Sequence, residues 1–419
     1  MSISYKTPAS FADFSCLGGD CEDTCCRNWE IKLDRQHFGL LKKAMQDDKG
    51  DKEKFEHYIR LNNNSITGDH DYAYIHMGEN GYCAMLDEQG LCSIHAKHGV
   101  TVLGDVCTMF PRVISRCGNT VELSGALSCP QVVRDCINDS SPLKFKRFKP
   151  SDLPRSKNYP IQRELSQHND DFYGENFSYV RENVMNIIAA EEVSLDTRLY
   201  IMANLAHKLS DFYHRGCNQP GKGQLESVFA TFFDKEFTAK MDNYINDYDA
   251  GSPVSMIVVH SVLMIKLQQA EKENISILYD SIIQHYCDDN NKIPEVLAEQ
   301  LSKILVNLDN EKKEYIDKAL SRYILNCLYR EWFISMPDLF TYVQMLLVRI
   351  SILRTLIVLD IGRNSEMGMI ELKQKIVYVM YNYARNIDQN LDFLKVVYNA
   401  LSEQTMMNFD FSPAFIRIS

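Results

Sequence analysis

The most informative feature of the sequence is a concentration of cysteine near its start. Ten of the thirteen cysteines lie between Cys16 and Cys136. The densest stretch contains Cys16, Cys21 and the adjacent pair Cys25 and Cys26. Adjacent side chains point in different directions, so one core cannot bury both thiols in the same way, whereas a polynuclear centre or two neighbouring centres can use both. The pattern therefore predicts thiolate-bound metal within residues 1–140, with iron and sulfide favoured.

Disulfides and unliganded core thiols are the alternatives. The first residues, Met1 to Pro8, lack the apolar core region and the small-residue cleavage site of a signal peptide. Disulfides are rare in the cytosol, where clustered cysteines more often indicate metal binding or catalysis. We therefore expect a cytoplasmic protein with reduced cysteines. The lone Cys217, Cys287 and Cys327 are interpreted as small buried hydrophobic residues.

The spacing leaves the identity of the metal open. Zinc takes four ligands in a tetrahedron, often from two CxxC pairs, and although no clean CxxC pair occurs here, loops can deliver ligands at other spacings. The CxxxCxxC spacing of radical S-adenosylmethionine enzymes also fails, because Cys21 and Cys25 supply two positions and Asn28 falls on the third. His95 and His98 are interpreted as surface or supporting residues, since enough thiolates are already present.

Composition and charge bound the class of protein. A length of 419 residues is sufficient for two or three domains, and the net charge of −11 argues against a nucleic-acid partner. We predict a cysteine-rich iron–sulfur domain at 1–140, a basic, proline-rich connector at 141–168 and a helical domain at 169–419.

Helical periodicity dominates after residue 170. The segment 337–361 is long and apolar, but Arg349, Arg354 and Asp360 interrupt it, so we expect a buried helix and no membrane partner. Further helices are predicted at 34–45, 197–214, 254–267, 372–385 and 391–401, and a short strand at 121–127. The expected fold class is mainly α, with a loop-rich cysteine-cluster region packed on an all-helical C-terminal domain.

Three motif segments together resemble the flagellin lysine N-methylase family. They are the stretch from Phe14 to Trp29, the stretch from Cys83 to His95, and Cys107-Thr-Met-Phe-Pro111-Arg112. The same segments resemble small bacterial zinc- or iron-chelating domains. The likeness covers roughly residues 10–135 and is looser over the helical remainder, including 378–390.

The resemblance implies transfer of a methyl group from S-adenosylmethionine to lysine side chains of flagellin, and a [4Fe–4S] cluster. Cys117 and Cys136 lie outside the family's motif, and the resemblance does not define which four cysteines hold the cluster. The cysteines that it implies as metal ligands are Cys16, Cys21, Cys25, Cys26, Cys83, Cys92, Cys107 and Cys129. A non-enzymatic zinc or iron–sulfur adaptor is the alternative function, and a metal-storage or redox-sensing protein is a third.

A lysine amine must lose its proton before it attacks a methyl sulfonium. Because an acidic protein raises the pKa of a nearby amine, the reaction needs a desolvated pocket. Tyrosines beside a carboxylate are candidates for that pocket, namely Tyr378, Tyr381, Tyr383 and Asp388. Their helical spacing is equally typical of ordinary core and helix-face residues.

Overall fold

The computed structural model describes residues 3–27, 31–62, 69, 71–78, 81–156, 159–165, 172–214, 222–249, 253–268, 274–287, 292–364 and 366–418. The chain divides into two compact units. The N-terminal unit comprises Met1–Val132 and Phe145–Glu164, and the C-terminal unit comprises Val133–Lys144 and Leu165–Ser419.

A five-stranded sheet forms one part of the N-terminal unit, in the order β7-β1-β6-β5-β8. Strand β1 pairs in parallel with β6 and antiparallel with β7, while β5 and β6 form an antiparallel hairpin. The predicted strand at 121–127 is confirmed as β6, whereas the other strands were not predicted. Their bounds are β1 (Ser4–Pro8), β5 (Arg112–Cys117), β6 (Thr120–Gly125), β7 (Phe145–Arg147) and β8 (Arg163–Leu165).

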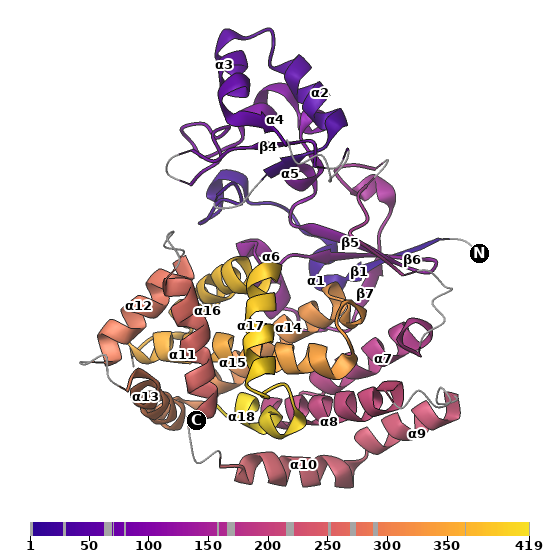
Figure 1. The fold of residues 1–419 in the computed structure, drawn as a ribbon, viewed down its shortest axis with the longest axis vertical. Coiled ribbons are helices and arrows are strands. Elements are labelled where there is room, and N and C mark those ends of the chain that lie inside the picture. Colours follow the sequence, from indigo (N-terminus) through magenta and orange to yellow (C-terminus); the bar gives the residue numbers. More distant parts are fainter. Residues whose placement is uncertain are drawn as a thin grey trace. The chain divides into compact units, whose positions relative to one another are not determined.

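A second, three-stranded sheet in the order β2-β4-β3 lies nearer the cysteine motifs. Its strands are β2 (Ile31–Leu33), β3 (Ile59–Leu61) and β4 (Ala73–Ile75). Ile31 and Leu33 are buried while Lys32 between them is exposed, the period of two expected of a strand with one covered face. Four helices surround this sheet (Figure 1), namely α2 (Arg35–Ala44), α3 (Lys49–Tyr58), α4 (Ser93–His98) and α5 (Asp105–Met109).

Helix α2 confirms the helix predicted at 34–45. It begins after Asp34, whose side chain accepts the backbone N–H of His37 and so caps the helix N-terminus. Leu41 and Met45 face the core that the small sheet shares with α3 and α4. The remaining short elements of this unit are α1 (Ala9–Ala12), η1 (Gly18–Asp20), η2 (Val100–Val102) and η3 (Pro150–Asp152).

The segment predicted as a connector contains β7, η3 and β8. Residues 145–164 belong to the N-terminal unit, and 133–144 and 165 onward belong to the C-terminal unit. The domain limits at 140 and 168 stay predictions.

The C-terminal unit is built around α15 (Leu339–Gly362). Nearly every side chain of α15 is buried, and the helix contacts α8, α11, α12, α13, α14, α16 and α18. The other helices are α6 (Pro130–Ile137), which crosses into this unit, α7 (Phe172–Ala189), α8 (Leu195–His214), α9 (Lys222–Phe232), α10 (Lys235–Asp247), α11 (Val254–Leu267), α12 (Asn274–Tyr286), α13 (Ile293–Asn307), α14 (Asn310–Arg330), α16 (Met369–Tyr383), α17 (Leu391–Glu403) and α18 (Ser412–Ile416).

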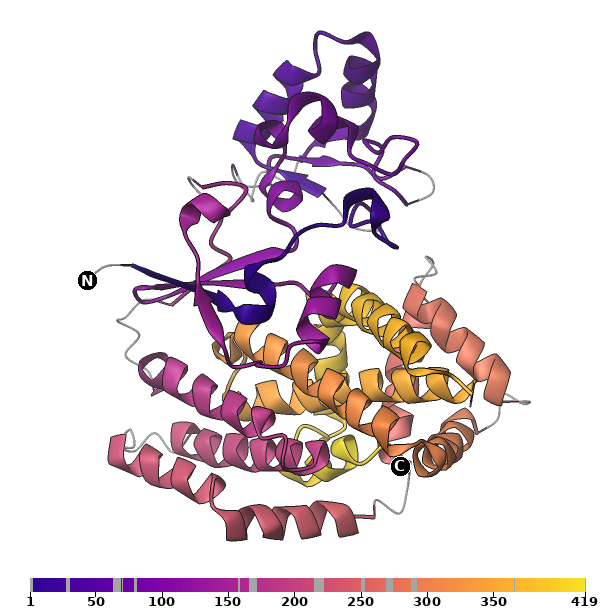
Figure 2. The same cartoon turned by 180° about the vertical axis from the view of Figure 1, so that it is seen from behind.

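The helices predicted for this unit are confirmed as α8, α11, α15, α16 and α17. Helices α9 and α10 form an outer layer beside α8 (Figure 2). A π-helical turn, η5 (Ala384–Asp388), follows α16, and short 3₁₀ turns occur at η4 (Phe333–Ser335) and η6 (Phe409–Phe411). Among the described helices, none combines the length and the apolar character needed to cross a bilayer. The mainly α fold class is thus confirmed.

Candidate metal centre

The eight motif cysteines all lie in the N-terminal unit, on separate segments between residues 16 and 129. Cys16 follows α1, and its sulfur accepts the backbone N–H of Gly18 at 3.4 Å. Gly18 has a φ of 57°, a left-handed conformation that glycine adopts without strain. Cys21 ends η1, and its thiol donates to the carbonyl oxygen of Asp23 at 3.1 Å. The left-handed conformation of Gly18 therefore gives a turn between Cys16 and Cys21.

A backbone hydrogen bond holds the second group of cysteines, which begins at Cys83, against the segment that contains Cys16 to Cys26. The N–H of Cys83 donates to the carbonyl oxygen of Cys26 at 2.8 Å. The run from Asp87 to Gly90 in the sequence predicts a turn, and the turn is present, with Asp87 N–H bonded to Leu91 O at 2.8 Å and a bridge that pairs Leu86 with Cys92. This turn brings Cys92 back towards Cys83, as the sequence predicted.

One hydrophobic core supports four of the cysteines. Cys83 is buried within the cluster formed by the small sheet, α2, α3 and α4. Cys26, Cys92 and Cys107 pack against that same cluster and are half-buried. Helix α5 carries Cys107 and ends at Met109, before Pro111, as expected of a residue that cannot continue a helix.

Cys25 lies centrally among the thiols. Its Sγ is 4.0 Å from the Sγ of Cys26. Burial, with smaller contributions from neighbouring Cys92 and Cys25, raises the pKa of Cys83 to about 11. Burial raises the pKa of Cys107 still more, with contributions from Cys83, Cys92 and Cys25. The thiols of Cys25, Cys83, Cys92 and Cys107 are therefore near enough to influence one another's pKa.

Cys25 also lies near a second set of thiols. Burial, with smaller contributions from Cys21 and Cys25, raises the pKa of Cys129 to about 12. Burial likewise raises the pKa of Cys21, with contributions from Cys16 and Cys25 among others. Burial lowers the pKa of Arg112, which lies near Cys16 and Cys129. Cys25 thus lies near Cys26 and near thiols of both sets, while Cys16 lies near Cys21.

This donor set fits a bound metal cation. Buried thiols whose pKa lies near 11 or 12 are protonated at neutral pH, and a metal cation supplies the positive charge that lets them ionise. A zinc–sulfur bond of about 2.3 Å places the sulfurs of a tetrahedral site roughly 3.8 Å apart. Among the described residues, no three cysteines have sulfurs all within 4.8 Å of one another. Eight motif cysteines exceed the four ligands of one tetrahedral zinc site.

The two histidines after Cys92, His95 and His98, lie on α4. His95 is exposed on α4. The Nε2 of His98 lies 3.5 Å from Asp51, which also accepts hydrogen bonds from Lys97 at 2.9 and 3.0 Å. Asp51 therefore accounts for the position of His98.

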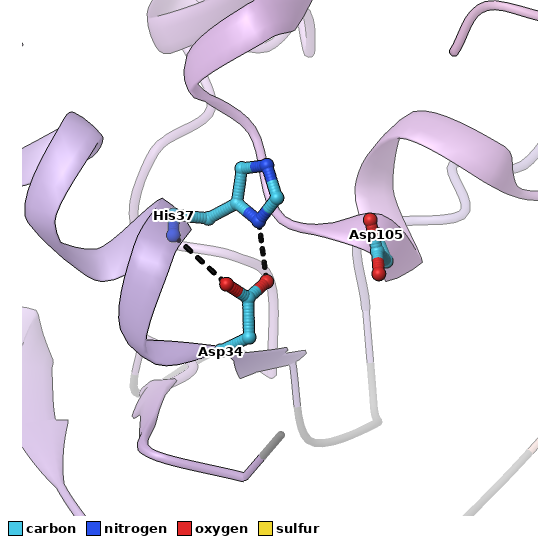
Figure 3. Close-up of side chains that lie close together, drawn as sticks. All are labelled: Asp34, His37 and Asp105. Carbon is cyan, nitrogen blue, oxygen red and sulfur yellow. Dashed lines mark hydrogen bonds and ion pairs between the residues drawn. The ribbon is translucent and has the colours of Figure 1, made fainter. Parts of the chain in front are cut away.

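A polar cluster that the sequence did not predict lies at the start of α2. Asp34 contacts the Nδ1 atom of His37, and the carboxylate of Asp105 approaches from α5 (Figure 3). Arg155 pairs with Asp105 and donates to Leu103 O at 2.6 Å. The helix cap and the guanidinium already satisfy these carboxylates, so the cluster joins α2 to α5 rather than binding a metal. The Asp-x-x-His spacing of Asp34 and His37 is the feature of the sequence that could have predicted this cluster.

The remaining cysteines have other surroundings. The thiol of Cys136 donates to the carbonyl oxygen of Arg322 at 3.3 Å, within the C-terminal unit. Cys117 is half-buried at the end of β5. Cys327 is buried as predicted, Cys287 is half-buried rather than buried, and Cys217 lies outside the described residues.

The C-terminal unit contains a buried network of charges that includes one candidate catalytic residue. Arg349 on α15 donates to Asp388, and also to Glu331 at 2.8 and 3.0 Å. Arg330 lies 2.6 Å from Glu331 and 3.4 Å from Asp388. Two arginines thus offset two carboxylates in a nearly solvent-free site. Cys327 completes a group of metal-ligand types here, but the arginines already hold both carboxylates.

The candidate tyrosines divide between this network and the surface of α16. Tyr383 is fully buried and donates to the backbone oxygen of Arg349 at 2.8 Å. Burial, with a contribution from Asp388, raises the pKa of Tyr383 far above its usual value. Tyr378 is exposed, and its ring meets that of buried Tyr381 edge-on at 5.7 Å. Tyr383 is linked to Asp388 through Arg349, whereas Tyr378 is exposed on α16. A catalytic role for Tyr378, Tyr381, Tyr383 and Asp388 stays a prediction.

Comparison with known proteins assigns a family to both parts of the chain. Residues 15–130, which include all eight motif cysteines, match a family described as a candidate zinc- or iron-chelating domain. Residues 181–411 match the family described as the FliB lysine N-methylase C-terminal domain. These matches define a class in which a chelating domain precedes a lysine N-methylase domain. The chain belongs to the FliB lysine N-methylase family.

Curated relatives have consistent names. A lysine-N-methylase of Salmonella typhimurium (strain LT2) is 33% identical over 145 residues, which is 33% of this chain and 33% of that protein. The lysine-N-methylase of Salmonella choleraesuis (strain SC-B67) matches to the same extent. The flagellar biosynthetic protein FliU of Salmonella muenchen is 31% identical over 175 residues, covering 38% of this chain and 96% of that protein. The matched part thus spans a third of the two lysine-N-methylases. No solved structure matches the chain.

Proposed function

We propose that this protein transfers methyl groups from S-adenosylmethionine to lysine side chains of flagellin, and that its N-terminal cysteines bind a [4Fe–4S] cluster. The observation that carries the proposal is that the thiols of Cys21, Cys26, Cys83, Cys92, Cys107 and Cys129 lie near Cys25 in a chain whose C-terminal part belongs to the lysine N-methylases. The name of the relative FliU, a flagellar biosynthetic protein, supports flagellin as the substrate class.

The proposed reaction balances without a redox partner. The lysine ammonium first loses a proton, and the free electron pair of the amine then attacks the methyl carbon of the sulfonium. A carbon–nitrogen bond forms and a carbon–sulfur bond breaks, with its electron pair passing to sulfur. The products are methyl-lysine, S-adenosylhomocysteine and a proton. A desolvated surrounding favours the neutral amine over the ammonium and so promotes the first step.

The cluster would be held by four of the eight motif cysteines. The number of thiols favours iron–sulfur over a single zinc ion, which remains the alternative metal. When bound, such a cluster would cross-link the separate segments of the N-terminal unit that carry its cysteines. Tyr383 and Asp388 remain candidates for the catalytic groups, with Tyr378 and Tyr381 as weaker ones. We place the protein in the cytoplasm, where flagellin is available before export.

The test begins with anaerobic purification of the whole chain. We expect a brown protein with iron and sulfide in equal amounts and an absorption band of an iron–sulfur cluster. Incubation with flagellin and methyl-labelled S-adenosylmethionine should transfer label to lysine. A colourless protein containing only zinc would overturn the cluster. Failure to label lysine under reducing, anaerobic conditions would overturn the methylase and leave a metal-binding adaptor.

A further inference from the structure

A hollow of about 930 Å³ lies beside Cys83 on the N-terminal unit. The end of α3, the segment after β4 and the turn after Cys83 form its walls. Below we call it the Cys83 hollow. The residues of its wall on which the argument depends are His57, Tyr58, His76, Tyr82, Asp87 and Glu88.

The charge of the hollow is one-sided. Asp87 and Glu88 contribute carboxylates, and none of the described residues that line the hollow is a lysine or an arginine, although Arg27 lies against the lining residue Tyr82. Asp87 is held in place because its side chain accepts the backbone N–H groups of Gln89 and Leu91 at 3.0 and 2.9 Å. Glu88 is exposed and has no ion-pair partner among the described residues. The hollow therefore favours a cation and disfavours an anion.

Aromatic rings add a second feature that favours a cation. The rings of His57 and Tyr58 meet edge-on at 4.6 Å, and Tyr82 lies on another wall. The guanidinium of Arg27 already stacks 5.2 Å from the centre of the Tyr82 ring. Aromatic faces attract ammonium groups, and apolar walls accommodate the methylene chain that carries one.

We propose, building on the methylase function above, that the Cys83 hollow receives the side chain of the substrate lysine. A lysine side chain carries one positive charge on an apolar stem and no anion, which matches the hollow. S-adenosylmethionine also has a positive charge, but it carries a carboxylate, and the nearby guanidinium of Arg27 is already paired with Asp23 at 3.5 Å. Because Cys83 forms part of the wall, a bound amine would lie next to the candidate metal centre.

The experiment compares two charge reversals in the whole, metal-loaded protein. Glu88→Lys changes the hollow, and Glu53→Lys makes the same change in charge at an exposed position of α3 outside the lining. We expect Glu88→Lys to raise KM for flagellin about fivefold with kcat little changed, and Glu53→Lys to leave both near wild type. The affinity for S-adenosylmethionine should be unchanged in both variants.

A binding measurement separates this inference from the proposed function. Fluorescence anisotropy of a labelled (Gly-Lys)4 peptide measures lysine binding to the Cys83 hollow even if wild-type protein fails to methylate flagellin. Weaker peptide binding by Glu88→Lys alone supports the hollow. Equal binding by all three proteins, or equal loss in both variants, overturns it. Lost affinity for S-adenosylmethionine in Glu88→Lys, with KM for flagellin unchanged, would assign the hollow to the methyl donor and also overturn it.

Discussion

The sulfur atoms of Cys25 and Cys26 lie 4.0 Å apart on adjacent residues, and the thiols of Cys83, Cys92, Cys107, Cys21 and Cys129 lie close enough to Cys25 for each pKa to reflect it. An adjacent pair at the middle of two sets of thiols can serve both sets. The pair therefore makes the sharpest test of metal binding.

Replacement of Cys25 or Cys26 by alanine should reduce bound iron and soluble yield together. Metal binding in such a domain is part of its folding free energy, because the unfolded chain has no preformed site. Metal analysis of each purified variant checks the prediction. Cys287→Ala, in the C-terminal unit, is the matched control and should keep its iron. Fully metallated, soluble variants at both positions would contradict the assignment.

Metal affinity should rise with pH. The raised pKa values of Cys83 and Cys129, about 11 and 12, mean that both thiols carry protons in the metal-free protein at neutral pH. Each proton released on binding increases the apparent affinity about tenfold per pH unit below those pKa values. Competition with a chelator of known proton affinity between pH 6 and 8 measures the slope. A flat profile would show that these thiols are not ligands.

Breaking the buried charge network should destabilise the C-terminal unit. Asp388→Asn leaves Arg349 and Arg330 with less compensating charge in a site without water, a change that costs about 3–5 kcal/mol in comparable networks. Urea unfolding followed by circular dichroism checks the loss. The double variant Asp388→Leu with Arg349→Met should recover part of it.

An exposed pair provides the control for that experiment. Lys395 and Asp392 form an ion pair on α17, with side chains 75% and 96% exposed. Lys395→Ala should leave the unfolding midpoint unchanged, since water screens such pairs. If Lys395→Ala lost as much stability as Asp388→Asn, urea unfolding would not distinguish buried from exposed ion pairs.

The N-terminal unit should lose stability in acid through Asp51. Burial alone would raise the pKa of Asp51, but hydrogen bonds from Lys97 and His98 lower it below its usual value. A lowered folded-state pKa means that the stabilisation is complete above the unfolded value of about 4 and is lost as pH falls through the folded pKa. Chemical unfolding at pH 7 and pH 3 should show Asp51→Asn with a smaller acid-dependent loss than wild type. Equal losses of stability in wild type and Asp51→Asn would show that Asp51 does not contribute to the acid sensitivity.

The helices of the C-terminal unit were predictable because long apolar periodicity is a strong signal. The residues that interrupted the 337–361 segment were read only as evidence against a membrane span. Arg349 in that segment also implied a partner, since a buried charge is costly unless paired, but Glu331 and Asp388 could not be chosen from sequence alone. Long-range pairing is set by packing, which local pattern does not contain.

The N-terminal unit was harder to predict. Strands of three residues such as β2 and β4 are too short to show alternation, and their partners are distant in the chain. Residue types identified the thiols, and the turn after Cys83 was predicted from its Asp-to-Gly run. The hollow beside Cys83 had no signal in sequence, because α3 and the segment after β4 meet there only through the fold.

The candidate centre has its possible donors on separate stretches of chain between residues 16 and 129, and the last of them, Cys129, comes just before α6. A nascent chain that has not yet reached this residue lacks one of the eight thiols, however much of the amino-terminal arm has left the ribosome. A centre that uses Cys129 can therefore be loaded only after residue 129 has been synthesised, and iron would then be delivered to a nearly finished unit rather than to an emerging peptide.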